Sequence, residues 1–234
     1  EYSSVKTVNC LYKDEEGRLW IGTNDSGVSI MIDETIINVV SEKEGLSADS
    51  VKCITQGSDG DYYIGTTGAM SVVSLAGGLT VKSYIDDIKY AVSADSDKNG
   101  NIAVVSDNGQ LSIVKNAAVI SEYSASDGGR YTTCSFDDAG MLYVGTSKGN
   151  IDKYEYDLYN NAYVLKESVS CNELNNIKEI YFVDNTLTEN GTLFVCADNG
   201  TGYYDSQNQF INIDTGSFNN SIDHMTADYQ GNLW

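Results

Sequence analysis

Residues 14–23 read DEEGRLWIGT, and varied copies of this phrase recur down the chain. The copies lie at residues 58–66, 97–106, 137–146, 189–197 and 228–234. Their turn glycines stand at positions 17, 60, 100, 140, 191 and 231, so the spacings are 43, 40, 40, 51 and 40 residues. A period of about 40–45 residues built from short strands is typical of propeller blades. The spacing therefore predicts the fold and gives every other residue a place within a repeat.

The first repeat predicts how one blade is built. Branched and aromatic residues favour strands at 8–13, 19–23, 28–32 and 35–40. Between the first two strands, Asp14 can cap a tight turn, and Gly17 can adopt the positive φ that other residues resist. The result is a four-stranded antiparallel meander, and no helix is predicted anywhere.

The predicted fold is an all-β β-propeller of four-stranded antiparallel blades, with five complete repeats and the start of a sixth. We expect one propeller over residues 1–234 and interpret it as a fragment of a longer array. The predicted blade cores are 8–40, 51–84, 91–123, 131–168 and 177–213, with a partial blade at 222–234. The 51-residue spacing places its extra residues in a longer hairpin at 154–162 and a loop at 184–190.

The charge of the chain limits its partners. Its 234 residues include 34 acidic and 14 basic side chains, which give a formal net charge of −20. Nucleic acid and anionic membranes both attract basic surfaces, so we predict no nucleic-acid partner and no direct membrane contact from this segment. A small polar ligand, such as a carbohydrate, remains compatible with this composition.

Metal and cofactor signals are weak. The five cysteines have no CxxC spacing, and their odd number excludes a complete disulfide framework. Residues 95–101 (DSDKNGN) read like the start of a calcium loop, but Ser106 stands where the bidentate glutamate belongs. We therefore predict no metal and no cofactor, and we leave calcium binding by Asp95–Asn101 open.

Catalytic signals are also weak, and we predict no catalytic residue. His224 is the one histidine, and no G-x-S-x-G elbow is present. The turn pattern is similar to the Asp-boxes of sialidases. Those enzymes grip a carboxylate with three arginines, whereas this chain has only Arg18 and Arg130. The chain is therefore predicted not to be an enzyme.

Aromatic residues recur at one position of the repeat, as Trp20, Tyr63, Tyr143, Phe194 and Trp234. We interpret them as core between blades, because a blade needs a bulky residue at a fixed place to pack on its neighbour. The third repeat has Ala103 there, a predicted weak point. Most residues seven positions before a turn glycine have small side chains. Small side chains are expected there because the first strands of the blades converge on the central axis of a propeller.

Propellers normally bind partners where the loops leading into each blade gather with the second turns. These loops are predicted at 45–50, 86–90, 126–131, 172–176 and 217–221. The candidate ligand-binding residues at this channel mouth are Asn24, Asp25, Tyr90, Asn108, Arg130, Tyr131, Asn199 and His224. Tyr131 is the predicted stacking surface. The alternative, that these are ordinary loop residues, stays open.

The repeated phrase Asp-x-x-Gly-x-Leu-Trp-Ile-Gly-Thr followed by a glycine turn resembles the repeat of the two-component regulator propeller family. The resemblance is closest at 14–27, good at 137–149 and 228–234, looser at 58–68 and 97–109, and degraded at 188–200. It implies the extracytoplasmic (periplasmic or cell-surface) sensor region of a membrane-anchored bacterial signalling protein. A histidine kinase or diguanylate cyclase output would lie outside this chain, and a dimeric parent receptor is compatible with this picture.

Three functions compete at this point. A ligand-sensing domain would bind a small polar solute reversibly without turnover. A protein–protein interaction scaffold or adhesin-like surface module would bind a partner protein instead. An enzyme, such as a propeller hydrolase or lyase, would need paired acids or bases at the channel mouth. The sequence favours the sensor.

Overall fold

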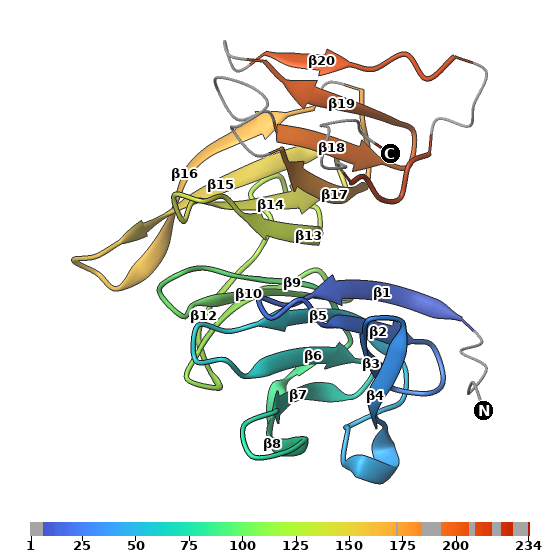
Figure 1. Ribbon diagram of the computed structural model, residues 1–234. Coiled ribbons are helices and arrows are strands. Elements are labelled where there is room, and N and C mark those ends of the chain that lie inside the picture. Colours follow the sequence, from blue (N-terminus) through green and yellow to red (C-terminus); the bar gives the residue numbers. More distant parts are fainter. Residues whose placement is uncertain (1–6, 172, 184–192, 206–208, 217–220, 227–233) are drawn as a thin grey trace. The chain divides into compact units, whose positions relative to one another are not determined.

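The computed structural model describes residues 7–171, 173–183, 193–205, 209–216, 221–226 and 234. It divides after Tyr123 into unit 1, Glu1–Tyr123, and unit 2, Ser124–Trp234. Each unit is built from four-stranded antiparallel meanders in which consecutive strands are neighbours (Figure 1). These sheets confirm the predicted β-propeller class of four-stranded blades.

Unit 1 contains blades 1 to 3. Blade 1 consists of β1 (Val8–Lys13), β2 (Leu19–Thr23), β3 (Val28–Ile32) and β4 (Thr35–Val40). Blade 2 consists of β5 (Val51–Gln56), β6 (Tyr62–Thr66), β7 (Ala69–Ser74) and β8 (Thr80–Lys89). Blade 3 consists of β9 (Ala91–Ser96), β10 (Ile102–Ser106), β11 (Leu111–Lys115) and β12 (Ala118–Tyr123). The four strands predicted for the first repeat match β1 to β4 at both ends.

Unit 2 contains blades 4 and 5. Blade 4 consists of β13 (Tyr131–Phe136), β14 (Leu142–Thr146), β15 (Asn150–Asp157) and β16 (Ala162–Ser170). Blade 5 consists of β17 (Ile177–Phe182), β18 (Leu193–Ala197), β19 (Gly200–Tyr204) and β20 (Phe210–Asn212). The longer hairpin predicted at 154–162 is confirmed by β15 and β16. The loop predicted at 184–190 lies outside the described residues, as does most of the sixth repeat, and the structure does not show a sixth blade.

Two local expectations are corrected. A 3-10 turn, η1 (Glu42–Glu44), forms where no helix was expected, because Ser41 and Glu44 make a capping box and Gly45 ends the turn with a φ of 105°. Residues 86–89, predicted as loop, belong to β8. Ile85 and Ile88 are buried there in the core between blades 2 and 3, which extends the strand. Among the described residues, no helix is long and apolar enough to span a bilayer.

The first strand of every blade carries a β-bulge near its start. The irregular pairing lies at Asn9, Lys52, Val92, Thr132 and Lys178. A bulge re-aims one side chain. Asn9 Nδ2 donates to Val51 O at 2.8 Å, and Thr132 Oγ1 donates to Ile177 O at 2.5 Å. At these two bulges, the extra residue therefore ties one blade to the next.

The core lies between neighbouring blades of a unit. Strand β6 shows the alternation that produces it, since Tyr62 and Ile64 pack toward blade 1 while Tyr63 packs toward blade 3. Trp20 stacks on Tyr62 with ring centroids 3.8 Å apart. In unit 2, Ile151 and Ile177 belong to the corresponding core of blades 4 and 5. Side chains of both sheet faces are buried, as stacked repeats require.

The prediction that the repeated aromatic packs in the core is confirmed for the copies that are buried. Trp20 and Tyr63 are buried, and Tyr143 and Phe194 are half-buried. Trp234 is different, because 76% of it is exposed. Ala103 is fully buried, and its role as a weak point stays a prediction.

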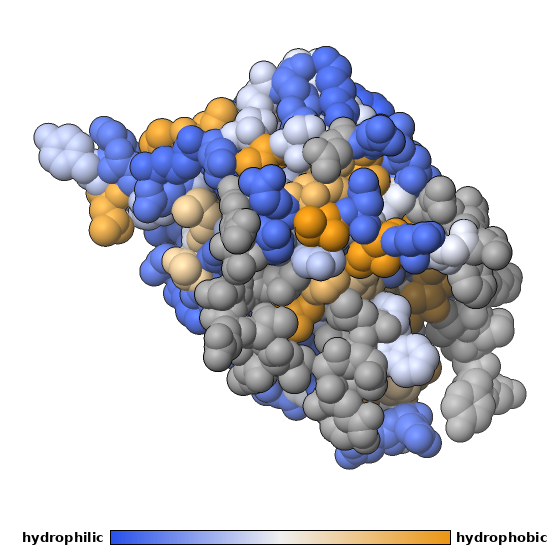
Figure 2. Space-filling view, turned by 90° about the horizontal axis from the view of Figure 1, so that it is seen from above, coloured by the Kyte–Doolittle hydropathy of each residue, from blue (hydrophilic) through white to orange (hydrophobic). Residues whose placement is uncertain are grey.

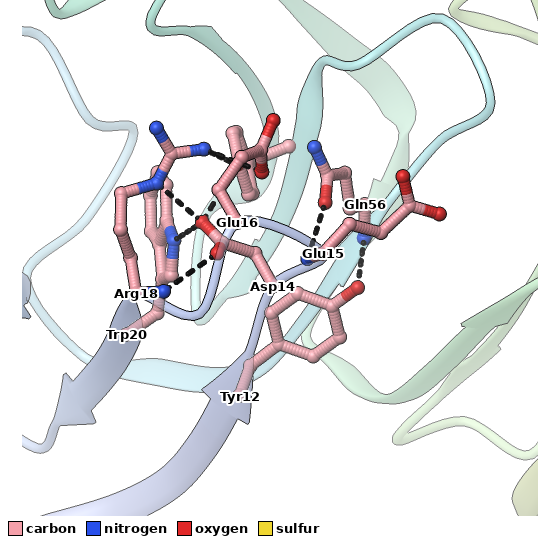
Figure 3. A network of polar contacts seen from close by, with 8 residues as sticks. Tyr12, Asp14, Glu15, Glu16, Arg18, Trp20 and Gln56 are labelled. Carbon is pink, nitrogen blue, oxygen red and sulfur yellow. Dashed lines mark hydrogen bonds and ion pairs between the residues drawn. The ribbon is translucent and has the colours of Figure 1, made fainter.

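The aspartate of the repeated phrase is a turn device, and Figure 3 shows it in blade 1. Asp14 accepts hydrogen bonds from Arg18 N at 2.8 Å, Arg18 Nε at 2.6 Å and Trp20 Nε1 at 2.9 Å. Tyr62 OH donates to the same carboxylate at 2.8 Å from the next blade. Asp137 repeats the pattern with Met141 N and Tyr143 OH. The phrase is therefore scaffold.

Candidate functional site

In a meander, successive turns lie at opposite ends of the strands, so the aspartate turns and the predicted binding loops lie at opposite ends of each blade. A small hollow lies at the aspartate end of blades 2 and 3 and is lined by Gly57, Asp59, Tyr63, Asn99 and Lys115 among others. The candidate residues predicted from the sequence lie at the other end of the blades.

The threonine that ends the repeated phrase holds the second turn. Thr23 Oγ1 donates to Gly27 O at 2.9 Å and accepts from Ser26 N at 2.9 Å. Thr66 accepts from Gly68 N, and Thr146 accepts from Lys148 N and Asn150 N. The second turn of each of these blades is thus fixed by the same phrase that forms the aspartate turn.

Tyr90 is the most unusual candidate in unit 1. Its φ of 52° lies in the left-handed region, which is uncommon for a bulky residue. Its backbone is tied on both sides, since Tyr90 N donates to Gly68 O at 3.3 Å and Asp107 N donates to Tyr90 O at 2.9 Å. The side chain is nevertheless open, and 56% of the residue is exposed. The structure therefore holds an aromatic ring in solvent on a fixed backbone.

The other unit 1 candidates are exposed turn residues. Asn24 Oδ1 accepts from Ser50 Oγ at 3.5 Å, and Asp25 Oδ1 accepts from Ser26 Oγ at 2.8 Å. Asn108 Oδ1 accepts from Gln110 N at 3.0 Å. Each of these oxygens already supports a turn or loop, so the groups offer a ligand only their remaining hydrogen-bonding capacity.

Tyr131 is a correction in unit 2, because only 2% of it is exposed and its ring cannot serve as the predicted stacking surface. Its hydroxyl donates to Asp152 Oδ2 at 2.7 Å and lies 2.6 Å from Tyr154 OH. Burial, followed by these hydrogen bonds, raises the pKa of Tyr131. Ser126 N and Oγ donate to the same buried Asp152. The network anchors the loop that leads into blade 4.

Arg130 and Asn199 lie in exposed loops of unit 2. Arg130 N donates to Ser147 Oγ at 3.0 Å, and Ser147 N donates to Arg130 O at 2.8 Å. Asn199 uses both ends of its amide, since Nδ2 donates to Glu173 O and Oδ1 accepts from Asn175 N, each at 2.8 Å. The Asn199 amide therefore stabilises the neighbouring loop, although it was predicted to bind a ligand.

A cluster of polar side chains in unit 2 surrounds Lys178. Lys178 Nζ lies 2.8 Å from Asp198 Oδ1 and 2.5 Å from Asp223 Oδ1, and donates to Ser221 Oγ at 2.9 Å. Asn176 Nδ2 donates to Asp198 Oδ2 at 2.7 Å. The hydrogen bonds to Asp198 and Asp223 raise the pKa of Lys178. The cation thus bridges the second turn of blade 5 to the segment that follows it.

His224 lies beside this cluster. Its side chain is 79% exposed, and its Nδ1 is 3.5 Å from Glu179 Oε1. Met225 N donates to Glu179 Oε2 at 2.5 Å. Burial raises the pKa of Glu179, and the contacts with Met225 and His224 oppose that shift. Both oxygens of this carboxyl group therefore have partners in the segment that follows blade 5.

Sequence reasoning missed Lys178 and Glu179, although a signal was present. The structure aligns Glu179 with Cys10, Cys53, Ser93 and Thr133, because each is the third residue of a first strand with the same bulge. A carboxylate among small groups marks a departure from the repeat. The degraded turn of the fifth copy hid the correct register.

The structure also bears on the loop at residues 95–101. Asp97 Oδ1 accepts from Asn99 N and Asn101 N, and Asp97 Oδ2 accepts from Asn101 Nδ2 at 2.7 Å. This is the turn pattern of Asp14 and Asp137, with an amide in place of the aromatic donor. Within the described part of the chain, no three His, Cys, Asp or Glu side chains gather as metal ligands.

Comparison with known families gives one match. Residues 2–25 match the family described as two component regulator propeller. This segment contains the best copy of the repeated phrase, and it supports the family resemblance. No curated protein matches the chain.

Solved structures share the fold at low identity. One is described as the extracellular domain of a hybrid two component system from B. thetaiotaomicron, with a TM-score of 0.74 and 18% identity over 97% of this chain. A virginiamycin B lyase from Staphylococcus aureus has a TM-score of 0.73 and 13% identity over 99% of this chain. An auxiliary nutrient binding protein from Bacteroides ovatus has a TM-score of 0.63 and 10% identity over 89%. The chain spans 32%, 78% and 57% of these three proteins, respectively.

Proposed function

The chain carries the repeat of the two component regulator propeller family, and from this premise we propose that it is a ligand-sensing, non-catalytic propeller. It would act outside the cytoplasm as part of a membrane-anchored signalling protein, with the output module elsewhere in that protein. Its ligand would be a small polar solute, with carbohydrate as the first class to test. Nucleic acid is not a partner in this proposal, because the chain carries a charge of −20.

The sensing role is supported by the match at residues 2–25 together with the likeness in fold to an extracellular domain of a hybrid two component system. The protein from Bacteroides ovatus that shares the same fold is described as nutrient binding, without naming the nutrient. The lyase shares that fold too. Fold alone does not distinguish binding from catalysis, so the function must be argued from particular residues.

Tyr90 is the observation that carries the ligand part of the proposal. Backbone strain at a bulky residue persists only where the surrounding structure enforces it, and such strain gathers at functional sites. The exposed ring offers a flat apolar face. Asp107, whose N donates to Tyr90 O, and Asn108 after it in the chain are exposed polar residues. A sugar ring needs this combination of an apolar platform with hydrogen-bonding neighbours.

A thermal-shift screen of oligosaccharides against the complete propeller tests the proposal. We expect at least one sugar to raise the Tm, and mass spectrometry should find that sugar unchanged after incubation. Tyr90→Gly should weaken binding about tenfold, since an aromatic contact contributes up to about 1.5 kcal/mol. Glycine accepts the φ of 52°, so the backbone is kept while the ring is lost.

Tyr159→Ala is the matched control, because Tyr159 is an exposed tyrosine elsewhere in the chain. It should leave sugar binding unchanged. Conversion of a bound sugar would contradict the non-catalytic role and favour an enzyme. A screen without any binder would contradict ligand sensing and leave a protein-interaction scaffold as the better function.

A further inference from the structure

In the hairpin of β15 and β16 both strands are long, whereas in the corresponding hairpin of blade 2 only β8, with 10 residues, is long. Strands β15 and β16 have 8 and 9 residues, whereas β11 and β12 have 5 and 6. Figure 1 shows it in gold, reaching beyond the sheet of its own blade. The repeat does not need this extension, since blade 3 forms the same meander without it. The hairpin is therefore an addition to the scaffold.

Its tip exposes two large side chains to solvent. Leu158 is 87% exposed and Tyr159 is 96% exposed, and they are the two most exposed large hydrophobic residues in the described part of the chain. In Figure 2 the hairpin forms the lobe at the left edge, and orange hydrophobic surface lies on it. Val164 and Leu165, on the returning strand, are 41% and 40% exposed. The stem thus adds two exposed apolar side chains, one on each face of the hairpin.

The tip is held in shape by its own hydrogen bonds. Asp157 Oδ1 accepts from Tyr159 N at 2.8 Å and from Asn160 N at 3.2 Å, and Asp157 Oδ2 accepts from Asn160 Nδ2 at 2.6 Å. Asn161 completes the turn with a φ of 52°. A segment that is already ordered loses less conformational entropy when it binds. Leu158 and Tyr159 are therefore presented as preformed anchors.

The stem is also fixed. Lys166 Nζ lies 2.6 Å from Glu155 Oε2 across the two strands. The rings of Tyr156 and Tyr163 lie 5.1 Å apart, and Tyr163 in turn lies 5.8 Å from Phe136 of β13. Tyr163 is buried, so this aromatic series connects the projecting hairpin to the body of blade 4. The anchors consequently stand on a rigid support.

From these contacts we propose that the β15–β16 tip is a docking element that inserts Leu158 and Tyr159 into an apolar pocket with a basic rim on a partner protein. Tyrosine is one of the residue types enriched at the energetic centres of protein interfaces, and the exposed leucine beside it adds apolar area. The proposal does not rest on the sensing function or on any ligand of the propeller.

Charge decides between the possible occupants. Residues 157–161 read DLYNN, with one carboxylate and no cation at the tip. The chain as a whole carries −20, so a second copy of it would be repelled, and an anionic bilayer would be repelled too. A cationic rim around an apolar pocket complements both the tip and the field of the chain.

Photo-crosslinking tests the proposal. Benzoylphenylalanine replaces Tyr159 in the full-length parent protein within its own cells, and Ile120, an exposed residue of β12, is the control position. We expect one discrete protein adduct from position 159 and none from position 120. That protein is then purified and titrated against the propeller by calorimetry.

The variants then test the anchors. Leu158→Ser combined with Tyr159→Ser should weaken binding by at least about 30-fold, the size of an interface hot spot. Ile120→Ser should leave the affinity within about twofold. Both replaced anchor side chains lie in solvent, so the double variant should keep the Tm of the parent.

Two substitutions of Asp157 distinguish the contribution of the turn's shape from that of its negative charge. Asp157→Asn keeps an oxygen for the turn and removes the charge, so it should lower both the affinity and its dependence on salt. Asp157→Ala also removes the turn and should lower the affinity further.

Four outcomes would overturn the proposal. Two concern a different occupant: a crosslink between two copies of the chain, or binding to phosphatidylglycerol vesicles that the double variant abolishes. The other two concern the identified partner: it binds the double variant normally, or its affinity is independent of salt.

Discussion

Asp14 shows at the scale of one residue why the repeated phrase exists. Its carboxylate is buried and accepts from a backbone amide, a guanidinium, an indole and a phenol (Figure 3). Burial by itself raises the pKa of Asp14, but the hydrogen bonds from Arg18, Trp20 and Tyr62 outweigh it and hold that pKa below the ordinary value of 3.8. One side chain therefore joins a turn, its own strand and the next blade.

Asp14→Ala should lower the free energy of unfolding by about 3–5 kcal/mol, because it leaves Trp20 Nε1, Tyr62 OH and the Arg18 charge without this acceptor. Asp14→Asn should cost less, since one oxygen remains. Urea unfolding at pH 7 measures both. If Asp14→Ala unfolds at the urea concentration of the parent, the network has no energetic role.

The pH dependence of this effect follows from the lowered pKa. A carboxyl whose pKa is lower in the folded state stabilises the fold above its unfolded pKa, about 3.8, and that contribution is lost as the pH falls through the folded value. The gap in stability between the parent and Asp14→Asn should therefore be full at pH 7 and should shrink below pH 3.8. A gap that stays constant down to pH 2 would contradict this assignment.

The pKa of Glu179 is shifted in the opposite direction to that of Asp14. Burial raises its pKa, so ionisation of this group opposes folding, and the favourable contribution is present at low pH and lost as the pH rises through the folded pKa. Glu179→Gln keeps an acceptor for Met225 N without the charge. The variant should be at least as stable as the parent at pH 7 and lose any advantage at pH 4. Denaturant unfolding at both pH values, with Glu173→Gln in an exposed loop as control, checks this.

At the scale of the element, the glycine of the repeated phrase permits first and second strands to pack closely. A Cβ on Gly22 would meet Cys10 Sγ and lie 2.8 Å from Val51 Cγ1 of the next blade. Gly145 is crowded in the same way by Ile177, at 2.6 Å, and by Thr133. The recurring I-G-T and V-G-T sequences thus combine a close approach at glycine with a turn clamp at threonine.

Gly22→Ala should destabilise the chain by about 1–3 kcal/mol, as overpacking does in a filled core. Replacing Cys10 with alanine in the same chain frees part of the space and should recover part of the loss, which a double-mutant cycle measures by thermal or urea unfolding. Ser26→Ala on the exposed second turn is the control. Simple additivity of the Gly22 and Cys10 changes would argue against the contact.

At the scale of the whole molecule, we expect the net charge of −20 to have a large effect on stability. Self-repulsion between like charges destabilises a compact state, and salt screens it over about 10 Å at 0.1 M. Ion pairs such as Lys178–Asp198 offset only a small part of this repulsion, because exposed pairs contribute little.

The Tm should therefore rise by about 2–4 °C between 10 mM and 300 mM NaCl, as expected for a gain of about 1 kcal/mol in a chain of this length. Differential scanning calorimetry measures this. A Tm that falls with added NaCl would show that the ion pairs, rather than the net repulsion, control stability.

The sequence by itself determined the fold and the strand limits of the first repeat. The turn signals at Gly17 and the alternation around Trp20 are local, and local chemistry repeated at a fixed period specifies a blade. The family resemblance was determined in the same way, since it rests on the same phrase. These features could be predicted because each depends on neighbours within a few residues.

Only the tertiary structure decided which candidate residues remain open to solvent. Tyr90 and Tyr131 both precede or begin a first strand, but one ring is exposed and the other is buried against Asp152, a partner 21 residues away. Lys178 gained its role from Asp198 and Asp223, and the docking tip gained its shape from a hairpin whose length the repeat does not set. Burial and long-range pairing depend on how distant segments pack, and a local pattern does not encode them.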